Sequence, residues 1–205
     1  MPQLAWLPEP PAGTSICLGF DGSLNNDWTA LQAETMDGFS FTPRWGPNQF
    51  GTYWNPAEHG DRIPHGEVET AVDELFDRFD VVRAYCDPHD WETDIEDWAR
   101  KHGDDHVITW ETNRIKAMWA EITRFENDLR EGRITHDGDP VATLHIGQAK
   151  KVGKPGQMYI LGKPNEAQKI DLAMARILAH TAVRDSLAGG WEPPKPRSKM
   201  RVFRG

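Results

Sequence analysis

Three aspartates, Asp21, Asp87 and Asp171, lie beside apolar segments and could act together as one carboxylate cluster. Asp21 directly follows the apolar run 16–20, and Asp87 directly follows the apolar run 81–86. Asp171 lies inside an apolar pattern of helical spacing. A short apolar run that stops at turn residues is typical of a buried strand, and a carboxylate at its end is costly to bury without a partner. The sequence therefore indicates a site that something positive must neutralise.

A bound divalent cation is the usual partner for such a cluster. If the two strands are parallel neighbours, Asp21 and Asp87 emerge at one edge of the sheet, and Asp171 lies at the border of helix and sheet. Hard cations such as magnesium take oxygen ligands. Two such ions, held about 4 Å apart, activate water and stabilise the leaving oxygen in phosphodiester hydrolysis. Taken singly, each aspartate is equally well explained as a helix cap or turn residue, so the metal interpretation depends on all three.

The elements that would position these residues alternate between strands and helices. The first two expected strands are joined by a short turn, which predicts an antiparallel pair, and the later alternation predicts an α/β fold: a mixed sheet flanked by helices on both faces. Strands are expected at 16–20, 28–35, 39–44, 80–86, 106–109, 134–136 and 158–161. Helices are expected at 67–79, 91–102, 113–131, 140–150 and 168–186.

The chain of 205 residues suits one domain with a sizeable core. Residues 1–14 contain four prolines and are expected to form a linker or leading arm. The domain itself is expected to span residues 15–188. Residues 189–205 begin with two glycines and are rich in proline and basic residues, so we expect a flexible basic tail.

Charge is unevenly distributed along the chain. The formal net charge is −9, which by itself argues against a nucleic-acid surface. Residues 149–169, however, contain five lysines and a single acid. Among them, Lys150, Lys151 and Lys154 are candidates for contacts with a DNA backbone, although a solvated surface loop explains them equally well. No apolar run approaches the length needed to cross a bilayer, so no membrane partner is expected.

Four segments of the sequence resemble the nuclease domain of phage large terminases, in the order that this family has them. The opening block is Asp21-Gly22-Ser23 with 27–31, and the second acidic strand corresponds to 85–91. The later blocks correspond to 133–140 and 169–175. The resemblance covers roughly residues 16–184, which is far more specific than a single motif.

The resemblance implies an RNase H-like fold and the cutting of double-stranded DNA during genome packaging, with Mg²⁺ or Mn²⁺, two ions in all, as cofactor. It places the family's three metal-binding catalytic aspartates on Asp21, Asp87 and Asp171. It also implies a phage protein of the host cell cytoplasm whose partners are double-stranded DNA, the terminase ATPase domain, the small terminase subunit and the portal. The family's large subunit normally begins with an ATPase motor, and no GxxxxGK[ST] loop is present here. The chain is therefore expected to correspond to the C-terminal half alone.

Two alternatives remain open at the level of sequence. In the first, the chain is a non-catalytic docking module whose aromatic segment 38–62 and basic tail bind the motor, the portal or DNA, while the acids are structural. In the second, the same acids serve a resolvase- or integrase-like nuclease that acts on branched DNA.

Overall fold

The computed structural model describes residues 7–165 and 167–193. A mixed sheet of seven strands forms the centre of this part of the chain, in the order β8-β7-β1-β2-β3-β9, with β6 paired to β2. β1 and β2 are antiparallel, whereas β1, β7 and β8 are mutually parallel. The strands are β1 (Ser15–Asp21), β2 (Thr29–Thr35), β3 (Phe39–Phe41), β6 (Tyr53–Trp54), β7 (Asp80–Cys86), β8 (Val107–Thr109) and β9 (Thr135–His136).

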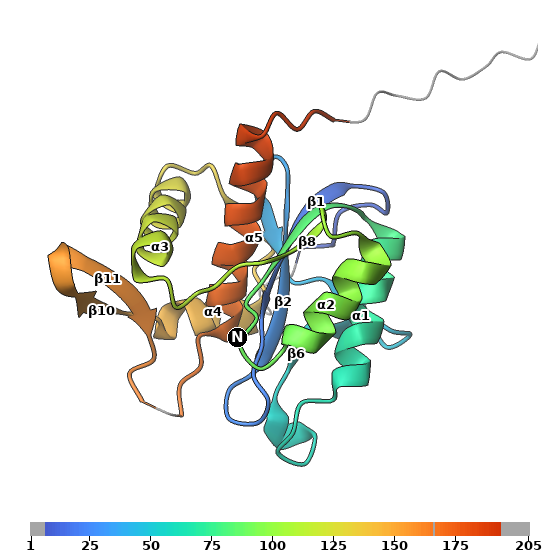
Figure 1. Cartoon of the computed structure of the whole chain (residues 1–205), viewed down its shortest axis with the longest axis horizontal. Helices are drawn as coiled ribbons and strands as arrows, with labels where there is room; N and C mark the ends of the chain where they lie inside the picture. The colour runs from blue at the N-terminus through green and yellow to red at the C-terminus, as the bar shows by residue number, and fades with distance from the viewer. Residues whose placement is uncertain (1–6, 166, 194–205) are drawn as a thin grey trace, which may run out of the picture.

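Helices cover both faces of the sheet, which confirms the expected fold class. Figure 1 shows α1 and α2 on one side of the sheet, and α3, α4 and α5 on the other. The helices are α1 (His65–Arg78), α2 (Glu92–His102), α3 (Ile115–Arg130), α4 (Pro140–Gln148) and α5 (Asp171–Ala188). Two small hairpins and two short 3-10 helices complete the chain: β4 (Arg44–Trp45) with β5 (Phe50–Gly51), β10 (Lys150–Lys154) with β11 (Met158–Gly162), η1 (Pro56–Glu58) and η2 (Pro155–Gln157).

β1 is apolar along its whole length because it is buried on both faces. Ile16, Leu18 and Phe20 pack into one core cluster with residues of α1 and α2. Cys17, which points to the opposite face, packs with α5. A strand buried on both faces reads as a continuous hydrophobic run rather than an alternating one. The apolar run at 16–20 is therefore continuous because its side chains alternate between two hydrophobic clusters, one on each face of the sheet.

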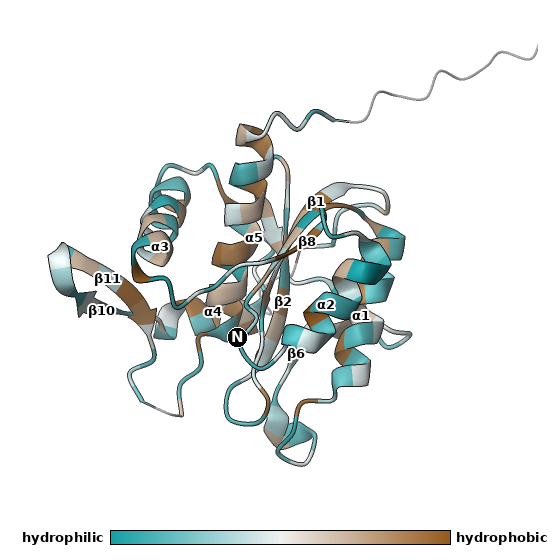
Figure 2. Cartoon of the chain, viewed as in Figure 1, coloured by the Kyte–Doolittle hydropathy of each residue, from teal (hydrophilic) through white to brown (hydrophobic). Residues whose placement is uncertain are grey.

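α5 lies directly across β1, and a single glycine makes the approach possible. A Cβ atom built on Gly19 would lie 2.0 Å from the carbonyl oxygen of Ala175 and 2.3 Å from the amide nitrogen of Ala179. A side chain larger than hydrogen at Gly19 would therefore force the two elements apart. In Figure 2 the middle of α5 is coloured hydrophobic, whereas α1 and α2 show largely hydrophilic surfaces to the viewer.

Several expected elements differ from those observed. The helix expected at 140–150 ends at Gln148, and Lys150 begins the strand β10 instead. The strand expected at 39–44 is divided into β3 and β4, because Pro43 has no N–H to donate to a ladder. The helix expected to begin near residue 168 begins at Asp171. Before it, the Gln168 amide closes a turn onto the Asn165 carbonyl, and the Lys169 amide donates to the side chain of Gln148.

The expected arm and tail lie partly outside the described residues. Residues 1–6 of the arm and 194–205 of the tail are not among them. Within the described part of the arm, the Leu7 amide donates to the Asp137 carbonyl at 2.9 Å, and the Glu9 carboxylate pairs with Arg78 at 3.5 Å. Residues 7–9 thus contact the main sheet and α1.

Candidate active site

The parallel pairing of β1 and β7 places Asp21 and Asp87 at the same edge of the sheet. The two strands run in register from Ser15 opposite Asp80 to Phe20 opposite Cys86, with one irregularity. The pairing ends where the Asp87 amide donates to the Phe20 carbonyl at 3.0 Å. The condition on which the sequence placed Asp21 and Asp87 together, that these two strands are parallel neighbours, is therefore met.

Asp171 is the first residue of α5 and is delivered to the same edge by the crossing at Gly19. Ala175 contacts Gly19, and Asp171 lies one helical turn before Ala175 on α5. Asp21 lies two residues beyond Gly19 on β1. The close approach of α5 to β1 thus brings Asp21 and Asp171, which are distant in the sequence, close together in space.

Asp21 and Asp171 line one cavity of about 260 Å³. The remaining lining residues come from the turn after β1, from the end of β11 and from the start of α5: Asp27, Leu161, Gly162, Lys163, Ile170 and Met174. Asp87 is not among the lining residues. It lies beside Asp21, and its carboxylate accepts a hydrogen bond from the Thr112 hydroxyl.

Burial and mutual repulsion make this cluster electrostatically unfavourable. Burial first, and then the charges of Asp171, Asp87 and Asp27, hold the pKa of Asp21 well above its ordinary value. Burial also raises the pKa of Asp171 to about 6, with the nearby charge of Asp27 acting in the same direction. The Asp171 Oδ2 atom is buried without a hydrogen-bond partner in the described residues. A backbone hydrogen bond and the charges of Lys169 and Lys163 lower the pKa of Asp171, but burial outweighs them and the pKa stays raised.

Asp27 is the acid of this pocket that is already neutralised. Lys163 Nζ lies 2.7 and 2.9 Å from its two carboxylate oxygens, and Lys169 Nζ lies 2.7 Å from one of them. Burial works to raise the pKa of Asp27, but hydrogen bonds from both lysines outweigh it and the pKa is lowered. Both lysines lie far from Asp27 in the sequence, so no local pattern around Asp27 indicates these ion pairs.

A neutral histidine supports the start of α5. Burial, followed by the charge of Lys169, lowers the pKa of His145 to about 4. Its Nδ1 accepts a hydrogen bond from the Leu172 amide at 3.3 Å and lies 3.9 Å from Asp171 Oδ2. Because that nitrogen accepts, the proton of the neutral ring is assigned to Nε2. His145 therefore fixes the first turn of α5, whereas His89 and His136 are exposed.

The donor atoms of the pocket suit a hard divalent cation. Asp21, Asp87 and Asp171 offer only carboxylate oxygens, and one of them is an unpartnered buried oxygen. Oxygen-only donor sets are those preferred by magnesium and manganese. Within residues 7–165 and 167–193, however, no three His, Cys, Asp or Glu side chains already form a cage around one point. The residue types fit the ion, with two of the aspartates at the pocket and the third adjoining it.

The three candidate DNA-contacting lysines all lie on β10. Lys150 and Lys151 are exposed and Lys154 is partly so. Lys151 Nζ pairs with Glu126 at 2.7 Å and lies 4.3 Å from the centre of the Tyr159 ring. In Figure 1 the hairpin of β10 and β11 projects from the side of the molecule that carries α3. The end of β11 lines the acidic pocket, so the hairpin connects the basic strand to the site.

None of the helices in the described residues is long and apolar enough to cross a membrane.

Comparison with known proteins relates this chain to phage proteins. No protein-family model matches the sequence. The chain is 30% identical over 187 residues to the Gene 13 protein of Mycobacterium phage D29, an alignment that covers 85% of this chain and 30% of that protein. The chain therefore spans about a third of the length of this curated relative.

Solved structures show the fold directly. The HK97 bacteriophage large terminase superposes with a TM-score of 0.62 at 19% identity, covering 86% of this chain and 41% of that one. The large terminase nuclease of thermophilic phage G20c, solved with bound magnesium, superposes with a TM-score of 0.62 at 12% identity, covering 87% of this chain and 92% of that one. The resemblance seen in the sequence is confirmed at the level of fold: the chain has the fold of the large terminase nuclease domains.

Proposed function

We propose that this chain, which has the fold of large terminase nuclease domains, is a divalent-metal-dependent endonuclease that hydrolyses double-stranded DNA when phage genome packaging begins and ends. One observation carries the proposal. Asp21 and Asp171 come together in one buried pocket with pKa values raised by burial, and an Asp171 oxygen has no partner among the described residues. A protein that only needed a stable core would gain by replacing such acids with apolar residues.

The residues would act by holding and orienting rather than by forming a covalent intermediate. Asp21 and Asp171 would hold a cation from the two sides of the pocket, and Asp87 would hold a second beside Asp21, with its carboxylate oriented by Thr112. Bound Mg²⁺ or Mn²⁺ would supply an activated water and neutralise charge on the scissile phosphate. His145, neutral at physiological pH, would keep the first turn of α5 and hence Asp171 in place.

The β10–β11 hairpin would hold the DNA backbone next to the acids. Lys150, Lys151 and Lys154 are the residues proposed for this contact, and the strand that follows them ends at the pocket. Phosphate contacts of this kind position the duplex without reading its sequence. They would also offset the repulsion between DNA and a chain of net charge −9.

The wider setting is also part of the proposal. Relatives of this chain are mycobacteriophage proteins, so the chain would work in the host cell cytoplasm. Its partners would be double-stranded DNA, the terminase ATPase domain, the small terminase subunit and the portal. Translocation itself would be the work of that ATPase domain, whose phosphate-binding loop is not in this sequence.

A plasmid-nicking assay tests the nuclease directly. Supercoiled DNA with Mn²⁺ should be nicked by the wild-type chain and not by Asp21→Asn or Asp171→Asn. Asp104→Asn is the matched control, since Asp104 is exposed and precedes β8, at the edge of the sheet opposite to Asp87. Full activity in both pocket variants would overturn the assignment of these residues.

The docking alternative is separated from the enzyme by a metal titration. A nuclease of this kind should bind Mn²⁺ saturably and melt at a higher temperature when the ion is present. A docking module whose acids are structural should show neither effect.

A further inference from the structure

A second pocket, built from aromatic rings and glutamates, lies outside the acidic site. It has a volume of about 360 Å³ and is formed by the segment between β4 and η1 together with the first turn of α1. Its lining residues are Trp45, Phe50, Gly51, Tyr53, Trp54, Glu58, His59 and Glu67. None of these residues lines the cavity that holds Asp21 and Asp171.

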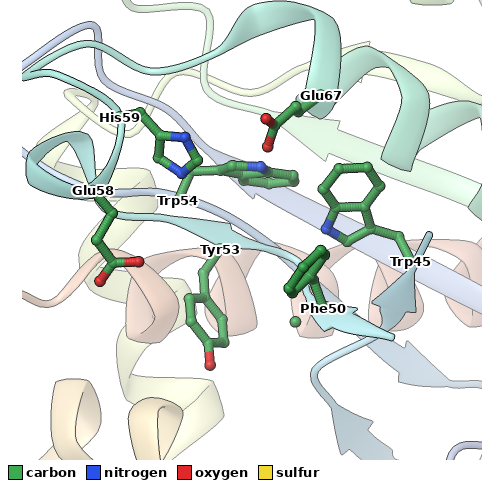
Figure 3. Close-up of a pocket in the computed structure, with 8 residues that line it drawn as sticks. Trp45, Phe50, Tyr53, Trp54, Glu58, His59 and Glu67 are labelled. Carbon is green, nitrogen blue, oxygen red and sulfur yellow. The ribbon is translucent and has the colours of Figure 1, made fainter. Parts of the chain in front are cut away.

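Three rings form the walls of this aromatic pocket. The ring centres of Trp45 and Trp54 are 5.9 Å apart at 41°, and those of Trp45 and Phe50 are 6.1 Å apart at 49°. In Figure 3 these rings stand around one hollow, and the carboxylate of Glu67 extends toward the ring of Trp54. Phe50 is 54% exposed, so one face of its ring is open to a ligand.

The charge of the pocket is negative and incompletely paired. Glu58 accepts one hydrogen bond from the Asn55 amide group at 3.1 Å. The Glu67 carboxylate makes no hydrogen bond or ion pair in the part of the chain that the structure describes. The lining contains no Lys or Arg. A phosphate backbone would be repelled by these glutamates, so stacking of nucleic-acid bases is disfavoured.

We propose that the aromatic pocket binds an arginine side chain of a protein partner. A guanidinium group is planar and stacks on aromatic faces, and it pairs with a carboxylate through two parallel hydrogen bonds. Trp54 is buried in the core, so the rings of Trp45 and Phe50, beside the Glu67 carboxylate, are the ones that offer both kinds of contact at once. An ammonium group would gain only the point-charge part of this interaction, which is why arginine rather than lysine is the occupant.

The pocket is joined to the main sheet at a defined place. Trp54 pairs with Thr29 and Tyr53 pairs with Ala30 on β2, and Ala30 in turn pairs with Asp21. A partner seated on Trp45 and Phe50 would therefore dock on the same end of the sheet as the acidic site, two strands away. The proposal stands whether or not the acidic site cuts DNA.

Titration with short capped peptides on the full chain tests the proposal. The probe is a Gly-Gly-Arg-Gly-Gly peptide, and its uncharged match carries citrulline in place of arginine. Binding is followed by calorimetry and by the shift of the Gly51 amide in ¹H–¹⁵N spectra. We expect saturable binding of the arginine peptide, with citrulline weakening it at least about fivefold, because its uncharged urea group loses the cation–π attraction to the rings and the ionic part of the hydrogen bonds to the carboxylate.

Variants locate the binding. Glu67→Gln and Phe50→Ala should each weaken the arginine peptide about fivefold or more, and neither removes a buried side chain. Glu69→Gln is the matched control on the exposed side of α1 and should leave binding unchanged. Equal binding of the citrulline peptide, an unchanged affinity in Glu67→Gln, or tighter Phe50-dependent binding of an oligothymidine would overturn the proposal.

Discussion

At the scale of single residues, the proposed site depends on acids that cost stability. The pKa of Asp171 rises from its ordinary value of 3.8 to about 6, chiefly because the side chain is buried. Below pH 3.8 the carboxyl is protonated in both folded and unfolded chains and contributes nothing. As pH rises to about 6 the unfolded chain ionises first, so the folded state loses stability and the full penalty applies above that pH.

We therefore predict that Asp171→Asn stabilises the chain when divalent ions are removed. A rise of about two pKa units corresponds to about 3 kcal/mol at most. The melting temperature in EDTA at about pH 7.5 should be higher in the variant, and the difference should vanish near pH 3.5. Asp104→Asn should show no such difference. A variant less stable than the wild-type chain at neutral pH would contradict the prediction.

Thr112 is predicted to orient Asp87. The Thr112 hydroxyl donates to the Asp87 carboxylate from the loop after β8. Thr112→Val should lower the nicking rate about tenfold or more and raise the Mn²⁺ concentration needed for half the maximal rate, since partners of ligating carboxylates have effects of this size. Thr112→Ser should restore both values. A merely structural role would change the melting temperature without this dependence on Mn²⁺.

At the scale of elements, the crossing of α5 over β1 brings the site together. A Cβ atom at Gly19 would meet the backbone of α5 at 2.0 Å. Gly19→Ala should therefore destabilise the chain by about 3 kcal/mol or more in urea denaturation, because backbone on both sides must move. Gly147→Ala is the control: Gly147 has open space around its Cβ position and lies in α4, so alanine there should cost nothing and gain up to about 1 kcal/mol. Equal effects at the two glycines would show that the crossing is not tight.

The β10–β11 hairpin is predicted to carry the contacts with DNA. Lys150→Ala combined with Lys154→Ala should weaken DNA binding and reduce the slope of log affinity against log salt by about 2, one unit for each phosphate that is no longer neutralised. Lys116→Ala removes an exposed lysine of α3 and should leave the slope unchanged. An unchanged slope in the double variant would place the DNA elsewhere.

At the scale of the whole molecule, the sequence predicted what local patterns determine. The run before Asp21 and the run before Asp87 are mainly apolar because both strands are largely buried. The sheet and its two helical layers were therefore predictable. The convergence of the two aspartates was predicted only on the condition that β1 and β7 are parallel neighbours, because β2 to β6 and α1 all lie between them in the chain. The start of α5 at Asp171 was not predictable, because Ile170 continues the apolar spacing of the helix although it precedes the first helical residue.

Contacts between distant segments could not be predicted from local patterns. Lys163 and Lys169 reach Asp27 across 136 and 142 positions of the chain. Thr112 reaches Asp87 from a loop that carries no motif. The aromatic segment 38–62 was expected to be largely loop, yet short strands fold it into a pocket. Each of these depends on tertiary packing, which no local spacing records.

The most direct measurement is a crystal soaked in Mn²⁺ and examined for anomalous scattering. We predict a peak between Asp21 and Asp171, with a second beside Asp87, at the ion concentrations that support plasmid nicking. Nicking by the crystallised protein without any peak at these carboxylates, or with peaks only at other acids, would contradict the proposed metal centre.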